Sequence, residues 1–347
     1  MNKTNNRVQW IDNIKIFGCV LVVLGHFCQS MIKSGIVENT AFSTWFIDTI
    51  YLFHVNLFFI ASGYLYQKFS KVYSLKSYGK NVLKKFIILG VPYFVFTTCT
   101  VLMKTIFSDD VNTQAGGLAD ALFVSPIPPY WYLFTLFFMF VFIPVFQNKK
   151  IFVPAFAAAV VLKIFLPQIS GVFSEAAGFE LPYFITSTVQ NAVWFLLGMS
   201  FSLFKWEKYF KNWVAWLMVG IFAVLSVFSQ HWQGLLNNSI FTFAASLLAC
   251  LGFCGIFYGA KHSKEGAAAS YFCIQYTLPV YLMHTICASA VRILLIKIGI
   301  FSPFIHIPLG IAASFALPAL AALIMRKLRP LNILFEPGKY LPKELKR

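Results

Sequence analysis

Apolar runs of about 20 residues, separated by short polar segments, recur along the whole chain, and a helix of that length crosses the ~30 Å hydrocarbon core of a bilayer. On this rule the sequence predicts ten membrane spans, at approximately 11–31, 44–66, 86–106, 130–147, 151–170, 183–204, 213–230, 236–259, 271–291 and 305–325. The predicted fold is therefore all-α, a polytopic helical membrane protein with about ten transmembrane helices. We expect one integral-membrane domain over residues 1–347, because the spans leave no room for a soluble domain.

Composition supports this class. Hydrophobic residues make up 59% of the chain and charged residues 12%, with a mean hydropathy of +0.73, whereas a soluble domain has about 25% charged residues. A transmembrane barrel would show alternating strands of ~10 residues, which are not found. No cleavable signal peptide is expected, since the first apolar run has charged residues at its start and leads directly into the second.

The net charge of +16 is distributed unevenly along the chain. With a cytoplasmic N-terminus, the predicted layout places 22 of the 28 Lys and Arg residues on the cytoplasmic side and five on the outer side. Basic residues collect on the cytoplasmic side of membrane proteins. We therefore expect both termini in the cytoplasm of a multi-pass protein of the cell (inner or plasma) membrane, in contact with lipid and without a nucleic-acid partner.

The seven cysteines all fall in apolar segments, so no disulfide framework is expected. No histidine spacing typical of a zinc site occurs, so no bound metal is expected. P-loop and other nucleotide-binding motifs are also absent from the sequence, which argues against ATP use.

Ionisable groups inside apolar runs are candidate functional residues, because burying them in a bilayer is costly. Lys15 and His26 are 11 residues apart, which places them on one face of the first helix, ~16 Å apart along its axis. Asp12 precedes Lys15 by three residues and is expected to pair with it. The alternative is that Lys15 extends to the membrane surface and that His26 only bridges helices.

Two further histidines, His54 and His284, lie at a similar predicted depth, so one polar cavity with three imidazoles is expected. For each alone, a hydrogen bond between helices is the alternative. Pro279 is expected to kink the ninth helix and to free the carbonyl of Gln275.

Six lysines and no acid lie between residues 67 and 85, among them Lys80, Lys84 and Lys85. Such a segment either contacts anionic lipid headgroups or binds a phosphorylated cofactor from the cytoplasm. A helical start here would bring Lys80 and Lys84 together, since they are four residues apart.

These motifs resemble the acyltransferase-3 family of membrane acyltransferases and, within it, the fucose 4-O-acetylase-like group that modifies surface glycans. The spacing from Lys15 to His26 matches the family's basic-x10-His signature. The other matching segments are residues 51–64 (like FHxPLFFxxSGY), 84–93 (basic residues before Pro-Tyr), 131–133 (WYL) and 277–284 (like SLxIYLxH). The sequence departs from the family where Asn56 replaces a proline and where lysines replace arginines before the Pro-Tyr pair.

The resemblance implies acyl transfer, most simply acetyl transfer from cytoplasmic acetyl-CoA, to a hydroxyl of a cell-surface or lipid-linked carbohydrate of the cell envelope. We predict His26 as the catalytic base, since an imidazole can accept a hydroxyl proton near neutral pH. Lys15 would orient the acyl-CoA and Asp12 would fix Lys15. The remaining predicted roles are phosphate binding by Lys80, Lys84 and Lys85, and acceptor binding by His54, Trp131 and His284.

Two other classes of function fit parts of the sequence. A transporter or flippase for a glycan or another anionic substrate also needs many spans and a polar cavity, although repeat symmetry typical of transporters is not found. An interaction partner of a glycan synthase would leave His26 replaceable. The acyl group (acetyl or succinyl), the acceptor sugar, covalent acylation of His26, the side of the membrane and the oligomeric state all remain open.

Overall fold

A computed structural model describes residues 7–114, 116–232, 234–260 and 264–346, and these residues contain helices but no strand. Ten helices of 12 to 34 residues overlap the ten predicted spans, which confirms the all-α membrane fold. Their bounds are α1 Gln9–Lys33, α2 Ala41–Phe69, α3 Leu75–Ile106, α4 Trp131–Phe142, α5 Lys149–Ala177, α6 Tyr183–Phe204, α7 Asn212–His231, α8 Ser239–Gly259, α9 Lys264–Lys297 and α10 Pro303–Lys327. Short elements complete the chain, namely a π-helical turn Asp120–Val124, 3₁₀ turns Trp206–Tyr209 and Pro337–Tyr340, α11 Arg329–Asn332 and α12 Lys343–Lys346.

Within the described ranges, eight of these ten helices are long and apolar enough to cross a membrane. The other two, α4 and α6, were predicted as spans but do not meet this description. Helix α4 has only 12 residues and ends at Phe142, where Ile143 is extended. Ile143 precedes Pro144, and a residue before proline disfavours the helical conformation. Helix α6 has 22 residues, but Ser187, Thr188 and Asn191 are among its buried side chains. It is thus an interior helix with a polar segment.

Helix α3 begins earlier than predicted, so most of the lysine-rich segment is helical rather than a loop. The N-cap Ser74 and Ser77 form a reciprocal capping box, in which each backbone N–H bonds the other side chain at 2.9 and 3.2 Å. Such a cap satisfies amide groups that would otherwise lack partners at a helix start. Lys80 and Lys84 consequently lie on consecutive turns of α3.

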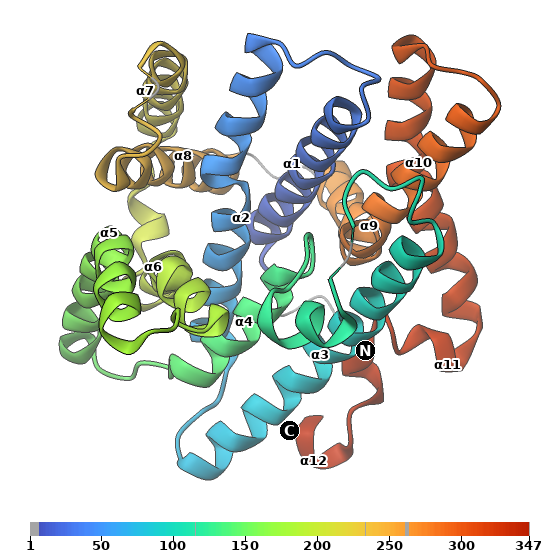
Figure 1. Cartoon of the computed structure of the whole chain (residues 1–347). Coiled ribbons are helices and arrows are strands. Elements are labelled where there is room, and N and C mark those ends of the chain that lie inside the picture. The colour runs from blue at the N-terminus through green and yellow to red at the C-terminus, as the bar shows by residue number, and fades with distance from the viewer. Residues whose placement is uncertain (1–6, 115, 233, 261–263, 347) are drawn as a thin grey trace.

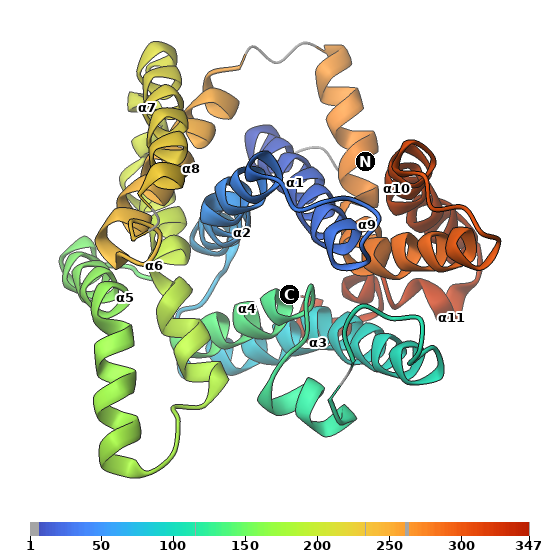
Figure 2. The same cartoon turned by 45° about the horizontal axis from the view of Figure 1, so that its top comes forward.

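Helices α1 and α2 lie centrally, between α5–α8 on one side and α9–α11 on the other (Figures 1 and 2). The crossing of α2 and α6 depends on two glycines. A Cβ at Gly63 would meet the carbonyl of Phe195, and one at Gly198 would meet the carbonyl of Ile60. Small residues of this kind let helix backbones approach closely inside a membrane.

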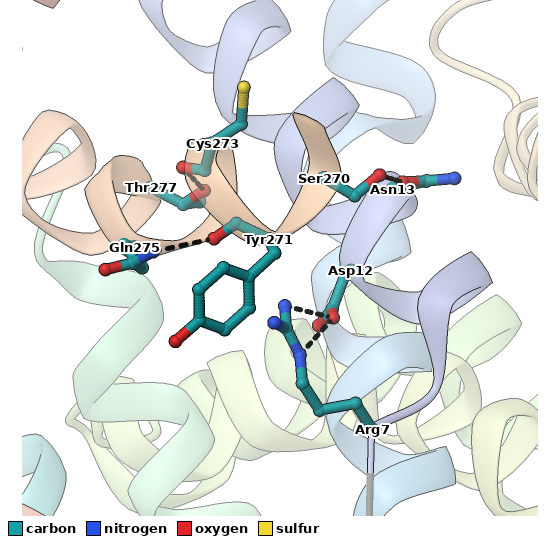
Figure 3. Close-up of polar contacts among 8 residues, drawn as sticks. All are labelled: Arg7, Asp12, Asn13, Ser270, Tyr271, Cys273, Gln275 and Thr277. Carbon is teal, nitrogen blue, oxygen red and sulfur yellow. Dashed lines mark hydrogen bonds and ion pairs between the residues drawn. The ribbon is translucent and has the colours of Figure 1, made fainter. Parts of the chain in front are cut away.

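Polar contacts join the start of α1 to α9 (Figure 3). The guanidinium of Arg7 donates to Asp12 Oδ2 at 2.6 and 3.0 Å and lies 4.6 Å from the ring centre of Tyr271. The close ion pair of Asp12 is formed with the guanidinium of Arg7 and not with Lys15 as predicted, although the Asp12 carboxylate is near enough to Lys15 to attract its charge. Ser270 also donates a hydrogen bond to Asn13, which further ties the two helices together.

The proline in α9 acts on the backbone as expected. Pro279 lies inside the helix and cannot donate to the carbonyl of Gln275. Arg326 of α10 donates to this oxygen at 2.6 Å. The freed carbonyl is thus satisfied by a neighbouring helix, as is common where proline occurs in membrane helices.

Candidate active site

A cavity of about 930 Å³ contains the three predicted midplane histidines, and we call it the histidine cavity. His26 comes from α1, His54 from α2 and His284 from α9, while Trp131 lines the same cavity from the start of α4. The structure therefore confirms the prediction that the three histidines converge on one cavity. The rings of His26 and His284 are neighbours, with centroids 5.4 Å apart.

Backbone carbonyls fix the tautomers of two of these histidines. His54 Nδ1 donates to the carbonyl of Ile50 at 2.7 Å. His284 Nδ1 lies 3.0 Å from the carbonyl of Val280 and 2.9 Å from that of Tyr281. In a neutral imidazole, one nitrogen donates and the other carries a lone pair, so Nε2 is the acceptor in both residues. The Nε2 atom of His284 is buried, and the part of the chain that the structure describes gives it no hydrogen-bond partner.

Tyr51 was not predicted as a site residue, but it connects the histidines. Its hydroxyl donates to Gln29 Oε1 at 3.0 Å and lies 3.4 Å from Nδ1 of His26. Its ring centroid is 4.8 Å from that of His54. Because the hydroxyl proton is given to Gln29, the hydroxyl can accept from Nδ1 of His26, which leaves the Nε2 lone pair of His26 free. The three-residue spacing between Tyr51 and His54 was the available signal, since it places both on one helix face.

A second cavity, of about 1110 Å³, contains the lysines, and we call it the lysine cavity. It is lined by Lys15 from α1 and by Lys80, Lys84 and Lys85 from α3, so these four predicted residues share one site. Lys15 and Lys84 are close enough to Lys85 to repel its charge, and the ammonium of Lys85 lies 4.2 Å from the ring centre of Phe140. The lining includes one carboxylate, that of Glu344 in α12. This excess of cations suits a ligand with several phosphates.

Three aromatic side chains line both cavities and separate them: Phe58, Tyr132 and Tyr281. We call them the aromatic partition. Their ring centroids lie 5.6 Å (Phe58–Tyr132), 6.0 Å (Tyr132–Tyr281) and 6.4 Å (Phe58–Tyr281) apart. A hydrogen bond between the hydroxyls of Tyr132 and Ser62 at 3.1 Å and one from Tyr281 to the carbonyl of Pro129 hold two of the rings. Since His284 follows Tyr281 by three residues, the partition lies about one helical turn from the histidines.

The predicted site residues thus fall into two groups on opposite halves of the molecule. His26, His54, Trp131 and His284 line the histidine cavity, and the four lysines line the lysine cavity. Asp12 lines neither cavity. Asn56, at the position of the family's proline, lines the histidine cavity and donates to the carbonyl of Leu52 at 2.8 Å. In the described part of the chain, no group of three His, Cys, Asp or Glu side chains is arranged to hold a metal ion.

Comparison with known proteins gives the chain its family. The nodulation protein NolL of Mesorhizobium japonicum (strain LMG 29417 / CECT 9101 / MAFF 303099) is 29% identical over 142 residues, which are 41% of this chain and 36% of that protein. The chain therefore matches only about a third of this curated relative's length. No solved structure matches significantly. A family model described as an acyltransferase domain matches residues 8–323, almost the whole chain. This match covers every cavity-lining residue of the transmembrane helices named above, and the chain belongs to the acyltransferase-3 family of membrane proteins.

Proposed function

We propose that this protein transfers an acyl group, most simply acetyl, from cytoplasmic acyl-CoA to a hydroxyl of a cell-surface or lipid-linked carbohydrate. The observation that carries the proposal is the pairing of a lysine cavity with a histidine cavity across the aromatic partition. A donor with several phosphates suits the lysines, and a hydroxyl acceptor suits imidazoles that carry free lone pairs. Membership of an acyltransferase family favours group transfer over transport of a glycan.

In this proposal the lysine cavity holds the coenzyme on the cytoplasmic side. Lys80, Lys84 and Lys85 bind the phosphates, and Lys15 lies deeper and orients the donor arm. The separation of Lys15 from His26 is ~16 Å from the helical rise, a length that an extended donor arm must cover to place its thioester beside the histidines. Only the end of the donor then has to pass the partition.

His26 is the proposed base. Its Nε2 accepts the proton of the acceptor hydroxyl while the hydroxyl oxygen attacks the thioester carbonyl. When the tetrahedral intermediate collapses, the carbon–sulfur bond breaks, and the coenzyme thiolate recovers the proton from the imidazolium. Tyr51 holds the ring of His26 through Nδ1. His54 and His284 face the same space and would bind the acceptor, with the ring of Trp131 available for stacking against a sugar.

The first test is acyl transfer in isolated membranes. Vesicles that contain the protein, with ion gradients collapsed, are incubated with radiolabelled acetyl-CoA and the glycan fraction of the same cells. We expect label in the glycan, and none with the His26→Gln variant at equal membrane levels. Label that depends on an imposed gradient would instead indicate transport. Label bound to the protein when acceptor is withheld would show that His26, or a neighbour, is acylated as an intermediate.

A further inference from the structure

We propose that the histidine cavity binds a phosphate-bearing acceptor, and that Lys33, Lys104 and Arg292 form its phosphate site. We call these three residues the cation cluster. The inference rests on the proposed function, because it specifies the acceptor of that same site. The first observation is that basic residues collect around the histidine cavity, although acyl transfer to a neutral sugar would not require them there.

The five basic residues that the charge pattern assigns to the outer side all line the histidine cavity. These residues are Lys33, Lys104, Lys163, Arg292 and Lys297. No Asp or Glu is among the described residues that line it, although seven of the 12 acids are assigned to the same side. Cations are disfavoured on that side of a membrane protein, so their collection around one cavity points to a ligand of opposite charge.

Arg292 is the strongest part of this argument. Its side chain is only 3% exposed, and one guanidinium nitrogen donates to Ser30 Oγ at 2.5 Å. Among the described residues, the Nε atom is buried without a hydrogen-bond partner, and no carboxylate forms an ion pair with the guanidinium. A buried cation costs several kcal/mol unless an anion accompanies it. An anionic ligand would supply the missing counter-charge.

The other basic residues of the cavity differ in the groups that their ammonium ions contact. Lys297 pairs with Asp110 at 2.7 Å, and Lys163 donates to the carbonyl of Gln190 at 3.0 Å. Within the described ranges, the hydrogen bond of the Lys104 ammonium goes to a neutral oxygen, that of Thr113 at 3.0 Å, and Lys104 lies close enough to Lys33 for their charges to repel. The described residues thus leave Lys33, Lys104, Lys163 and Arg292 without a carboxylate. Lys163 lies on α5 against α6, whereas the other three gather near the end of α1, where Arg292 donates to Ser30.

Helical spacing fixes where the anion would lie relative to the reaction. On α1, Lys33 follows His26 by seven residues, and on α9, Arg292 follows His284 by eight, so each cation lies ~10–12 Å from a histidine along its helix. Both helices therefore carry an imidazole with a cation about two turns farther toward the outer end. That separation is too long for the cations to stabilise the reacting carbonyl. They would contact a different part of the acceptor, which carries its phosphate at one end and its reactive hydroxyl at the other.

A phosphate fits these donors best. An arginine fork with two lysines can bind several oxygens of one phosphate group, and Asn112 is held beside the cluster by its bond to the carbonyl of Ser30 at 2.9 Å. A sugar phosphate and a phospholipid headgroup share this chemistry. We assign the site to the sugar phosphate, because Arg292 is buried inside the cavity that holds the histidines.

The test measures binding rather than turnover. Full-length protein in phosphatidylcholine nanodiscs, with saturating coenzyme A to occupy the lysine cavity, is titrated with glucose 1-phosphate and with the neutral probe methyl glucoside. We expect glucose 1-phosphate to bind at least about 10-fold more tightly, the scale of one hydrogen bond to a charged group. Arg292→Gln and Lys104→Gln should each remove about that advantage. Lys104→Gln changes a partly exposed residue and keeps the test valid if Arg292→Gln fails to fold.

The matched control is the double variant Lys208→Gln and Lys211→Gln, which changes two exposed lysines that line neither cavity and should bind glucose 1-phosphate as the wild type does. Equal binding of the two probes, or unchanged binding in both Arg292→Gln and Lys104→Gln, would overturn the proposal. Loss of glucose 1-phosphate binding in phosphatidylglycerol nanodiscs would overturn it too, by assigning the cluster to lipid headgroups. Coenzyme A binding, measured separately, tests the donor half of the proposed function, so the two can fail independently.

Discussion

Each histidine of the site is oriented by a contact at its Nδ1 atom. Backbone carbonyls hold His54 and His284, and the hydroxyl of Tyr51 lies beside His26. All three rings can therefore present Nε2 to a ligand. The histidines could be predicted from the sequence, because a polar ring in an apolar run is costly and conspicuous. Tyr51 was missed because it is one of 15 tyrosines, and its three-residue spacing from His54 was its one local signal.

Replacing His26 tests the proposed base. We expect His26→Gln to lower kcat by at least ~10²-fold, since general-base help is worth ~10²–10⁴-fold, with little change in the KM for acyl-CoA. Glutamine keeps a hydrogen bond but cannot take up a proton. Steady-state acetyl transfer by purified protein gives both constants. A near-wild-type kcat at normal membrane levels would transfer the role of base to His54 or His284.

Removing a positive charge and removing a negative charge from the lysine cavity should change the KM for acyl-CoA in opposite directions. Lys84→Gln combined with Lys85→Gln should raise the KM for acyl-CoA about 10-fold or more, because hydrogen bonds to charged groups contribute ~1.5–3 kcal/mol each. Glu344→Gln should lower it, by at most about fivefold, because this carboxylate would repel the donor phosphates but is exposed to solvent, where charge interactions are weak. Donor KM values measured at low and high salt check both. A donor KM that no lysine change affects would leave these residues as lipid contacts only.

At the scale of helices, hydropathy predicted every long element but not every boundary. The start of α3 was missed because its first turns are rich in lysine and its cap uses Ser77, whereas the usual third-position partner is Glu or Gln. Helix α4 ends just before Pro144, and a mean hydropathy over many residues does not detect a single proline. Boundaries set by single side chains or by proline are therefore lost in a window of about 20 residues.

The α2–α6 crossing gives a prediction at this scale. Gly198→Ala should lower the free energy of unfolding by about 1–3 kcal/mol, the usual cost of overpacking, because the new methyl group meets the carbonyl of Ile60. Gly220→Ala in α7 is the matched control, since nothing lies within 4 Å of its Cβ position. Thermal unfolding of the two proteins in the same detergent compares them. Equal Tm values would mean that the crossing tolerates a wider separation.

At the scale of the molecule, the sequence indicated which residues face inward but not how they are divided. The helical rise predicted the ~16 Å between Lys15 and His26 but not what lies between them. The structure has two cavities, because residues from α2, α4 and α9 meet between them. Contacts among such distant segments depend on helix packing, which leaves no periodic signal along the chain.

The orientation of the chain in the membrane is a prediction that labelling can check. After the exposed Cys99 and Cys273 are changed to Ser, single cysteines are placed at Lys76 and Asp109, both exposed and at opposite ends of α3. The charge bias predicts that an impermeant thiol reagent added to intact cells modifies Asp109→Cys but not Lys76→Cys. The reverse pattern would place the lysine cavity outside the cell, where acyl-CoA is not supplied.

The aromatic partition has a consequence for the energy supply of the cell. In the proposed orientation the two cavities approach each other from opposite faces of the membrane, and water in both would form a potential leak for protons that the three rings interrupt. Variants with Phe58→Ala and Tyr281→Ala should therefore dissipate an imposed pH difference across proteoliposomes faster than the wild type, as a trapped pH-sensitive dye would report. A narrow passage limits this leak but also limits the acyl groups that can cross. The small acetyl group proposed above would pass through an opening that still limits the flow of protons. An opening wide enough for longer acyl chains would let the ion gradient dissipate.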